Sequence, residues 1–166
     1  MGKTRAHGAS ARPATVIGWR EWVELPDLGL PPFPGKIDTG ARTSALHARK
    51  IRLEPQEEGP DMVSFILPTI AHRRGRRVAL PVHDERLIRN TGGKPEMRLV
   101  VRTLLRLGRR RWHIDVSLTD RTNMTHELIL GRTAVRGHRL LVDPGRSFLT
   151  GHPEGAPSTD TATPAA

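Results

Sequence analysis

The stretch Lys36-Ile37-Asp38-Thr39-Gly40-Ala41-Arg42-Thr43-Ser44 is the most informative part of the chain. An apolar residue precedes a single acid, and a hydroxyl residue and a glycine follow it at once. This order favours a strand that turns sharply, because Asp, Thr and Gly are all turn formers. It also places a carboxylate on a tight loop, where glycine lets the backbone come close. Asp38 is therefore the candidate catalytic residue, with Thr39, Gly40 and Ala41 as its supporting loop; an ordinary surface turn is the alternative.

The composition limits the classes of protein that fit. The chain has 166 residues, no cysteine and no apolar run of transmembrane length. Disulfides, thiol catalysis and cysteine-bound zinc are thus excluded. The N-terminus has no apolar segment typical of a secretory signal, so we expect a cytoplasmic protein that does not enter a membrane.

The formal net charge is +10, and arginine carries most of it. Such a charge attracts acidic partners and polyanions, although a solvated basic surface is an equally good explanation. With no tyrosine, three Trp and three Phe, the chain offers few aromatic side chains on which bases could stack. It also shows no recognisable nucleic-acid-binding motif, so nucleic acid is an unlikely partner.

The chain divides into a basic, disordered N-terminal tail (1–14), one domain (15–150) and a disordered tail rich in Pro, Ala and Thr (151–166). Inside the domain, short apolar runs are broken by Gly, Pro or charge, which predicts an all-β fold, a closed or partly closed barrel. A second informative stretch, Leu128-Ile129-Leu130-Gly131-Arg132, ends an apolar run on glycine and predicts one short helix near 132–136. The predicted strands are 15–23, 35–38, 47–54, 62–68, 76–82, 98–107, 111–119, 127–130 and 140–142.

These two stretches, in this order, resemble the retropepsin-like aspartic peptidases. The segments 37–48, 129–134 and 142–147 are similar to a bacterial family historically labelled ATP-dependent zinc proteases, and the resemblance covers about residues 16–150. It implies an acid-protease barrel with one short C-terminal helix, in which Leu130 and Gly131 form the floor of the cleft beneath the Asp38 loop.

The resemblance also implies a mechanism. Aspartic peptidases use two carboxylates that share one proton, and this chain has one Asp-Thr-Gly motif. The second carboxylate is therefore expected from another copy of the chain in a homodimer. No cofactor is expected. A flap should cover the cleft, and Thr91, Gly92, Gly93 and Lys94 are its candidate turn, with an ordinary surface loop as the alternative.

The same family resembles an accessory of ATP-grasp glutamate ligases that add glutamate tails to ribosomal protein. A peptide or polyglutamate substrate, and a functional link to such a ligase, are thereby implied. Arg86, Arg89 and Lys94 would hang over the cleft and suit an acidic substrate.

Two other functions stay open from the sequence. One is a zinc-dependent peptidase, as the historical label says, although the chain has no His-Glu-x-x-His motif and its eight histidines are scattered. The other is a non-catalytic binding domain that attracts acidic or ribosomal partners through its charge. No metal ligand is assigned.

Overall fold

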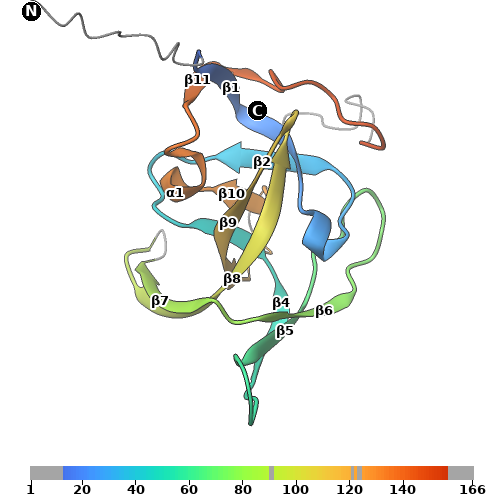
Figure 1. The fold of residues 1–166 in the computed structure, drawn as a ribbon, viewed down its shortest axis with the longest axis vertical. Coiled ribbons are helices and arrows are strands. Elements are labelled where there is room, and N and C mark those ends of the chain that lie inside the picture. Colours follow the sequence, from blue (N-terminus) through green and yellow to red (C-terminus); the bar gives the residue numbers. More distant parts are fainter. Residues whose placement is uncertain (1–12, 90–91, 121, 123–124, 157–166) are drawn as a thin grey trace, which may run out of the picture.

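The computed structural model describes residues 13–89, 92–120, 122 and 125–156. Strands dominate these residues, so the fold is all-β as the sequence predicts (Figure 1). In chain order the elements are β1 (Thr15–Glu24), the 3-10 turn η1 (Pro26–Leu28), β2 (Phe33–Ile37), β3 (Ser44–His47), β4 (Arg49–Glu54), β5 (Met62–Ile66), β6 (Arg77–Pro81), β7 (Asp84–Arg89), β8 (Pro95–Leu107), β9 (Arg110–Thr119), β10 (Leu128–Leu130), α1 (Arg132–Val135) and β11 (Leu140–Ser147).

A ring of strands forms the barrel. Its strands are hydrogen-bonded in the order β1, β2, β10, β3, β9, β8, and β8 returns to β1. The closing contact pairs Val23 with Leu107 and Glu24 with Arg106. Strands β11 and β7 lie outside the ring, against β1 and β8 respectively. The barrel is therefore closed, which is one of the two forms, closed or partly closed, that the sequence predicts.

Strand β2 shows why these residues form a barrel strand. Phe33, Gly35 and Ile37 are buried, whereas Pro34 and Lys36 are partly exposed. This period of two is that of a strand with one face on the core. The buried side chains join an apolar core to which every strand of the ring contributes.

A second sheet, antiparallel in the order β4-β5-β6, extends from the barrel at the bottom of the view in Figure 1. Val63 and Phe65 of its middle strand are fully buried and belong to the same core. One face of this sheet therefore packs against the barrel, and on the other Arg49, Arg52 and Arg77 are exposed although Ser64 of the middle strand is buried.

Two strands depart from the prediction. The first is β3, which is buried along its whole length, so it lacks the alternation by which half-buried strands are recognised. The second is β7, where four of the six residues in Asp84–Arg89 are charged. The sequence predicts no strand there, but β7 pairs antiparallel with the first half of β8.

Strand β11 is longer than predicted. The predicted strand ends at 142, but β11 continues to Ser147 beside β1, with a register shift between Gly18 and Arg20. Asp143 Oδ1 accepts the Gly145 N–H over 2.8 Å, and Oδ2 pairs with Arg146 Nε over 2.7 Å. Turn-like hydrogen bonds are thus made inside an irregular strand instead of at its end.

A buried glutamate ties the chain after β11 to β1. The carboxylate of Glu21 accepts hydrogen bonds from the backbone N–H groups of Gly18 (2.5 Å), Leu149 (2.9 Å) and Thr150 (3.2 Å), and from the Thr150 hydroxyl (2.8 Å). A fully buried carboxylate is tolerated when its oxygens are satisfied in this way. The C-terminal segment is thereby fixed to the barrel.

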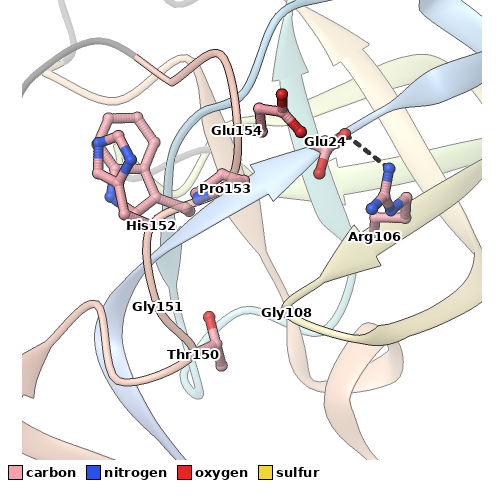
Figure 2. Close-up of a pocket in the computed structure, with 9 residues that line it drawn as sticks. Glu24, Arg106, Gly108, Thr150, Gly151, His152, Pro153 and Glu154 are labelled. Atoms are coloured by element: carbon pink, nitrogen blue, oxygen red, sulfur yellow. Dashed lines mark hydrogen bonds and ion pairs between the residues drawn. The ribbon is translucent and has the colours of Figure 1, made fainter.

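Beyond this anchor, the chain passes the place where the barrel closes (Figure 2). Glu24 of β1 and Arg106 of β8 form an ion pair of 3.1 Å there. With Thr150 and Glu154 they border an open cavity of about 410 Å³.

The helix α1 follows Gly131 and ends at Val135, close to the predicted range 132–136. No helix in the described part of the chain has the length and apolar character needed to cross a membrane. Of the predicted tails, only 13–14 and 151–156 are described, so their disorder and the domain limits 15 and 150 stay predictions.

Candidate active site

Asp38 is the residue directly after β2, at the point where the chain leaves the barrel wall. Strand β2 runs parallel to β10, with Lys36 opposite Ile129 and Ile37 opposite Leu130. The Asp38 N–H continues this pairing by donating to the Leu130 carbonyl over 2.9 Å. Both strands are buried here, so the backbone of Asp38 is held by the rigid part of the fold.

The carboxylate of Asp38 folds back over its own loop. Its Oδ1 accepts the N–H groups of Gly40 (3.0 Å) and Ala41 (3.1 Å). A Cβ on residue 40 would lie 3.2 Å from the same oxygen, which explains the value of glycine there. Among the described residues, none donates a hydrogen bond to Oδ2. The arrangement is an oriented, half-buried carboxylate with one oxygen held and the other open to a ligand.

Arg132, the first residue of α1, clamps the loop from outside. Its Nη1 donates to the carbonyls of Thr39 (2.9 Å) and Gly40 (2.8 Å), and its N–H donates to the Ala41 carbonyl (2.8 Å). A planar guanidinium suits such a pair of acceptors. These contacts make Arg132 a structural support for the loop.

The second half of the loop, Arg42–Ser44, is held by the same turn. The N–H and hydroxyl of Thr133 both donate to the Arg42 carbonyl, over 3.1 Å and 2.9 Å. The Gly131 N–H donates to Ser44 Oγ over 3.1 Å. A Cβ on Gly131 would lie 2.7–2.8 Å from backbone atoms of Arg42 and Thr43, so only glycine allows this close crossing. Leu130 and Gly131 thus lie against the Asp38 loop, and their role as the floor of a cleft stays a prediction.

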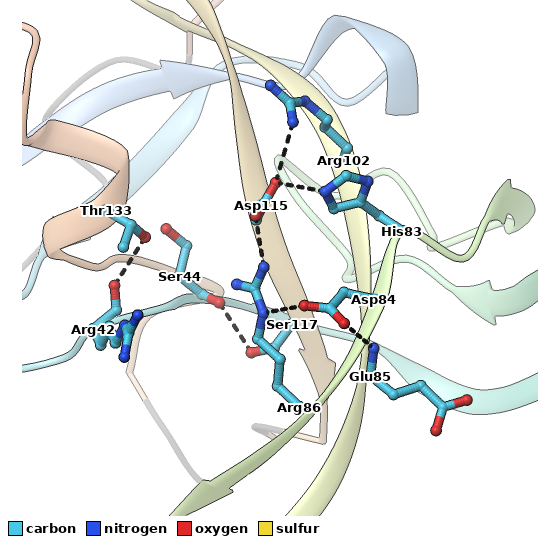
Figure 3. A network of polar contacts seen from close by, with 10 residues as sticks. All are labelled: Arg42, Ser44, His83, Asp84, Glu85, Arg86, Arg102, Asp115, Ser117 and Thr133. Carbon is cyan, nitrogen blue, oxygen red and sulfur yellow. Dashed lines mark hydrogen bonds and ion pairs between the residues drawn. The ribbon is translucent and has the colours of Figure 1, made fainter.

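A cavity of about 780 Å³ opens beside this loop. One wall is the backbone from Gly40 to Thr43 with Thr133, and the opposite wall is β7, from Asp84 to Arg89, with Asp115 between them. Figure 3 shows side chains of both walls, with Arg42 and Thr133 on one side and Asp84 and Arg86 on the other.

A network of charges crosses the cavity between β7 and β9. Arg86 pairs with Asp84 (2.6 Å) and with Asp115 (2.8 Å), and Asp115 also lies 3.5 Å from His83 Nε2 and 4.0 Å from Arg102 Nη1 (Figure 3). The bond to Asp115 raises the pKa of Arg86, and the bond from Arg86 lowers the pKa of Asp84. Arg86 is therefore engaged within the protein, and it does not hang free over the cleft as the sequence predicted.

Two other arginines on the cavity walls have no such partner. Arg42 lies on the loop wall and Arg89 on the β7 wall, and both are exposed. In the part of the chain that the structure describes, neither forms an ion pair with a carboxylate. The sequence singled out Arg89 for this place, but not Arg42.

The candidate flap is the turn of the β7–β8 hairpin. Gly92, Gly93 and Lys94 connect the two strands, and Gly93 has a positive φ of 76°, which favours glycine. Thr91 lies outside the described residues. Because the sequence predicted no strand at β7, it did not show that this turn joins β7 to β8 in a hairpin beside the cavity.

The residues do not fit a metal centre. Within the described ranges, no three His, Asp or Glu side chains gather as metal ligands. His47, which belongs to the buried strand β3, lies 3.7 Å from Asp120, and His83 contacts Asp115. A catalytic zinc requires three protein ligands at one point, which these positions do not supply.

The chain is similar to several known proteins. It is 40% identical over 138 residues to a protein of Desulfotalea psychrophila and 38% identical to one of Shewanella pealeana, both named "Probable alpha-L-glutamate ligase". These matches cover 82% of this chain but 29% and 30% of the two relatives, so the chain spans about three tenths of their length.

A crystal structure of a Legionella pneumophila protein of unknown function has the same fold. The TM-score is 0.69 at 29% sequence identity, and the match covers 82% of this chain and 98% of that protein. Residues 16–153 match the family described as "Retropepsin-like aspartic endopeptidase RimB". The chain therefore belongs to the RimB-like family of retropepsin-like proteins.

Proposed function

We propose that this protein is an aspartic peptidase in which Asp38 from two copies of the chain forms the catalytic dyad. The observation that carries the proposal is the hold on Asp38, whose Oδ1 accepts two backbone N–H groups while the loop itself is clamped by Arg132. Family membership supports the same chemistry. An oriented carboxylate beside a large open cavity suits general acid–base catalysis.

The second carboxylate comes from a second copy of the chain. Asp84 and Asp115 line the same cavity, but both are bound to Arg86 and so are poor candidates to share a proton with Asp38. A two-fold axis beside the loop would bring Asp38 against its own copy. Two carboxylates at such a distance cannot both ionise easily, so the pair holds one proton and titrates as a unit.

The reaction would then run as a direct attack by water. The ionised Asp38 takes a proton from a bound water, whose oxygen bonds to the carbonyl carbon of the substrate. The protonated Asp38 of the pair gives its proton to the carbonyl oxygen. As the tetrahedral intermediate collapses, the C–N bond breaks, the amine nitrogen receives the proton taken from the water, and one hydroxyl of the intermediate gives its proton to the ionised Asp38, so that the pair again holds one proton.

The β7–β8 hairpin is the proposed flap. Its strand β7 already forms the wall of the cavity opposite the Asp38 loop, and its turn includes Gly92, Gly93 and Lys94. Closure of such a hairpin over a bound peptide would exclude water from the dyad.

The substrate is proposed to be an acidic peptide, with polyglutamate as the simplest case. Arg42 and Arg89 face the cavity from opposite walls, and neither has a carboxylate partner among the described residues, so each can bind a carboxylate of a ligand. The relatives named as glutamate ligases carry an equivalent segment within a longer chain, which supports a functional link to enzymes that add glutamate.

The decisive experiment compares Asp38→Asn with the wild-type protein on a glutamate-rich peptide. We expect loss of cleavage by at least about 100-fold with an unchanged fold, whereas Asp61→Asn on the exposed β4–β5 loop should be fully active. Cleavage that survives Asp38→Asn and is abolished by a chelator would instead support the zinc-peptidase alternative.

Mixing the two proteins tests the shared dyad. With equal amounts of wild-type and Asp38→Asn chains, about a quarter of the dimers keep both carboxylates, whereas about half of the molecules stay active if each chain works alone. Activity that follows the second ratio would exclude the dimeric site. Peptide binding that persists in Asp38→Asn, with no cleavage by either protein, would identify a binding domain.

A further inference from the structure

The outer face of the β4-β5-β6 sheet is a surface of arginines. Strand register places Arg49 opposite Ile66 and Ile66 opposite Arg77. It also places Arg52 opposite Ser64. Residues opposite each other in an antiparallel sheet share a face, and so do Ser64 and Ile66, two positions apart on β5. Three arginine side chains therefore share one face of this sheet.

The irregularity in β4 is what brings Arg49 and Arg52 together. In a regular strand, residues three apart point to opposite faces. Here the register shifts between Arg49 and Arg52, and Lys50 has a positive φ of 50°. The extra residue of such a bulge turns the strand so that both arginines face outward. The inner face carries Val63 and Phe65, both fully buried, so this surface cannot be the packed one.

A basic loop connects β5 to β6 at the end of the sheet where Ile66 pairs with Arg77. Arg73 and Arg74 are exposed, and they lie in a tight turn in which Ile70 and Arg73 exchange backbone hydrogen bonds of 3.2 Å and 2.9 Å. The loop is fixed to the body because Arg76 Nη2 donates to the Leu28 carbonyl over 2.9 Å. A Cβ on Gly75 would lie 1.8 Å from the Leu67 carbonyl oxygen, so glycine is needed for this close packing.

The charge on this surface is not neutralised from within. Among the described residues, no ion pair includes Arg49, Arg52, Arg73, Arg74 or Arg77. Arg77 donates to Ser64 Oγ (3.0 Å) and the Lys50 carbonyl (3.4 Å), and so is held in place with its charge unpaired. Arg49 lies close enough to Asp120 to contribute, after Thr122 and His47, to its lowered pKa. Arginines elsewhere, such as Arg86 and Arg106, pair with carboxylates.

The surface has the chemistry of a phosphate-binding face. Phosphate backbones are bound by arginines on an exposed surface, without apolar contacts, whereas protein partners are held mainly by aromatic and apolar anchors at the centre of an interface. This face carries the three arginines together with Glu54, Met62, Ser64, Ile66, Ala79 and Pro81, so arginines outnumber its one acid and none of these described residues is aromatic. Single strands bind by stacking on aromatic rings, so a double-stranded backbone fits better.

We infer that Arg49, Arg52, Arg73, Arg74 and Arg77 form a docking surface for the phosphate backbone of double-stranded nucleic acid, read without regard to base sequence. The sequence made nucleic acid an unlikely partner because it lacks stacking side chains and known motifs. Contact with the phosphate backbone needs neither stacking side chains nor a known motif. Their absence therefore argues against recognition of bases, but not against binding of the backbone. None of the five arginines lines the cavity beside the Asp38 loop, so the surface is separate from the proposed peptidase site.

The test measures binding of a fluorescent 20-base-pair RNA duplex to the full chain as the salt concentration is raised. We expect the variant Arg52→Gln/Arg73→Gln/Arg74→Gln to bind at least about tenfold more weakly at low salt. The slope of log affinity against log salt should fall by about two to three. These three side chains are exposed and make no hydrogen bond among the described residues, so the fold should be kept, as circular dichroism and a thermal melt will check.

The matched control removes the same charge elsewhere. Arg109→Gln/Arg111→Gln/Arg136→Gln neutralises three exposed arginines on the β8–β9 turn and after α1. It should bind the duplex almost as the wild type does. Equal loss in both triple variants would show that net charge alone is responsible and would overturn the proposal, as would no binding by the wild type at low salt.

Further probes separate the possible ligands. A DNA duplex of the same length should bind similarly, because the phosphate backbone is the shared chemistry. If a polyglutamate peptide bound more tightly than the duplex and was lost in the Arg52, Arg73 and Arg74 variant, the face would be a protein-docking surface. Tighter binding of a single strand would likewise contradict a duplex site. Because binding is measured without cleavage, the result is independent of the peptidase proposal.

Discussion

Arg86 and Asp115 lie on strands that are not neighbours, yet Arg86 Nη2 donates to Asp115 Oδ2 over 2.8 Å. Strand β8 separates them in the sheet, and along it Arg86 is opposite Arg98 whereas Asp115 is opposite Arg102. The contact therefore requires the β7–β8 hairpin to curl back over the sheet. It holds β7 as the wall of the cavity that faces the Asp38 loop.

Breaking this contact should loosen the hairpin. We expect Arg86→Gln to lower the free energy of unfolding by about 1–2 kcal/mol, because a bond between charged, partly buried groups is lost and Asp115 keeps weaker partners. Amide hydrogen exchange should rise in β7 and not in β1. Arg146→Gln, which removes a more exposed ion pair with Asp143, is the control and should change stability by less than about 0.5 kcal/mol.

Arg132→Lys tests the clamp on the Asp38 loop. Arg132 Nη1 serves both carbonyls from a rigid, planar guanidinium, whereas the ammonium of lysine sits on a flexible stem and would not hold its N–H groups in fixed positions towards Thr39 and Gly40. We expect kcat for a glutamate-rich peptide to fall by about tenfold with little change in KM, since the carboxylate and not the substrate contact is disturbed. A rise in KM alone would mean that Arg132 contacts substrate instead.

Arg42→Gln and Arg89→Gln test the recognition of acidic substrates. Each should raise KM for a glutamate-rich peptide by about three- to tenfold, with kcat nearly unchanged, because a charge contact in the bound state is removed. A glutamine-rich peptide should not distinguish the variants from the wild type. Arg109→Gln changes the net charge equally and should leave KM unaltered at moderate salt.

Gly131→Ala should be strongly destabilising. The new methyl group would press on the backbone of Arg42 and Thr43, which cannot move without opening the loop. A loss of about 2–3 kcal/mol is expected from urea unfolding. Gly145→Ala is the matched control, since its Cβ would meet only Asp143 Oδ1 at 3.4 Å. If Gly145→Ala lowered the free energy of unfolding by a similar amount, the close contact of Gly131 with the Arg42–Thr43 backbone would not explain the effect.

His138 should make stability depend on pH near neutrality. Its ring stacks on Trp112, and burial, with a smaller contribution from the charge of Arg110, lowers its pKa from 6.5. The unfolded chain therefore takes up a proton that the folded chain resists, so the free energy of unfolding is highest above pH 6.5 and falls as the pH drops through 6.5 towards the folded pKa. His138→Gln should flatten this fall, and His113→Gln should not.

Much of the fold is visible in the sequence because most strands alternate between core and surface. The hairpin of β8 and β9 was predicted almost in full, and the glycine after Leu130 indicated where α1 begins. Strands β3 and β7 escape the same reasoning for opposite reasons. Strand β3 has no exposed face, because all four of its residues are buried, and β7 has no buried face, because its residues are exposed or only partly buried.

The candidate site was partly predictable. Asp38, Thr39, Gly40 and Ala41 stand out as a motif, and Gly131 as its neighbour in space. Sequence alone gave no sign that Arg86 is neutralised by Asp115, because the two are 29 positions apart and meet only through the curl of β8. The arginine face of β4-β5-β6 was hidden similarly, since it depends on one extra residue in β4.

The clamp on the Asp38 loop has a consequence for the order of synthesis. Thr39 is bonded to a side chain 93 positions later, and Asp38 to the carbonyl of Leu130. The acid is therefore made early, and its loop is assembled only when the last strands and α1 have left the exit tunnel. Until then the nascent chain carries the Asp-Thr-Gly motif without its geometry, so any activity that depends on this loop must wait for the end of synthesis.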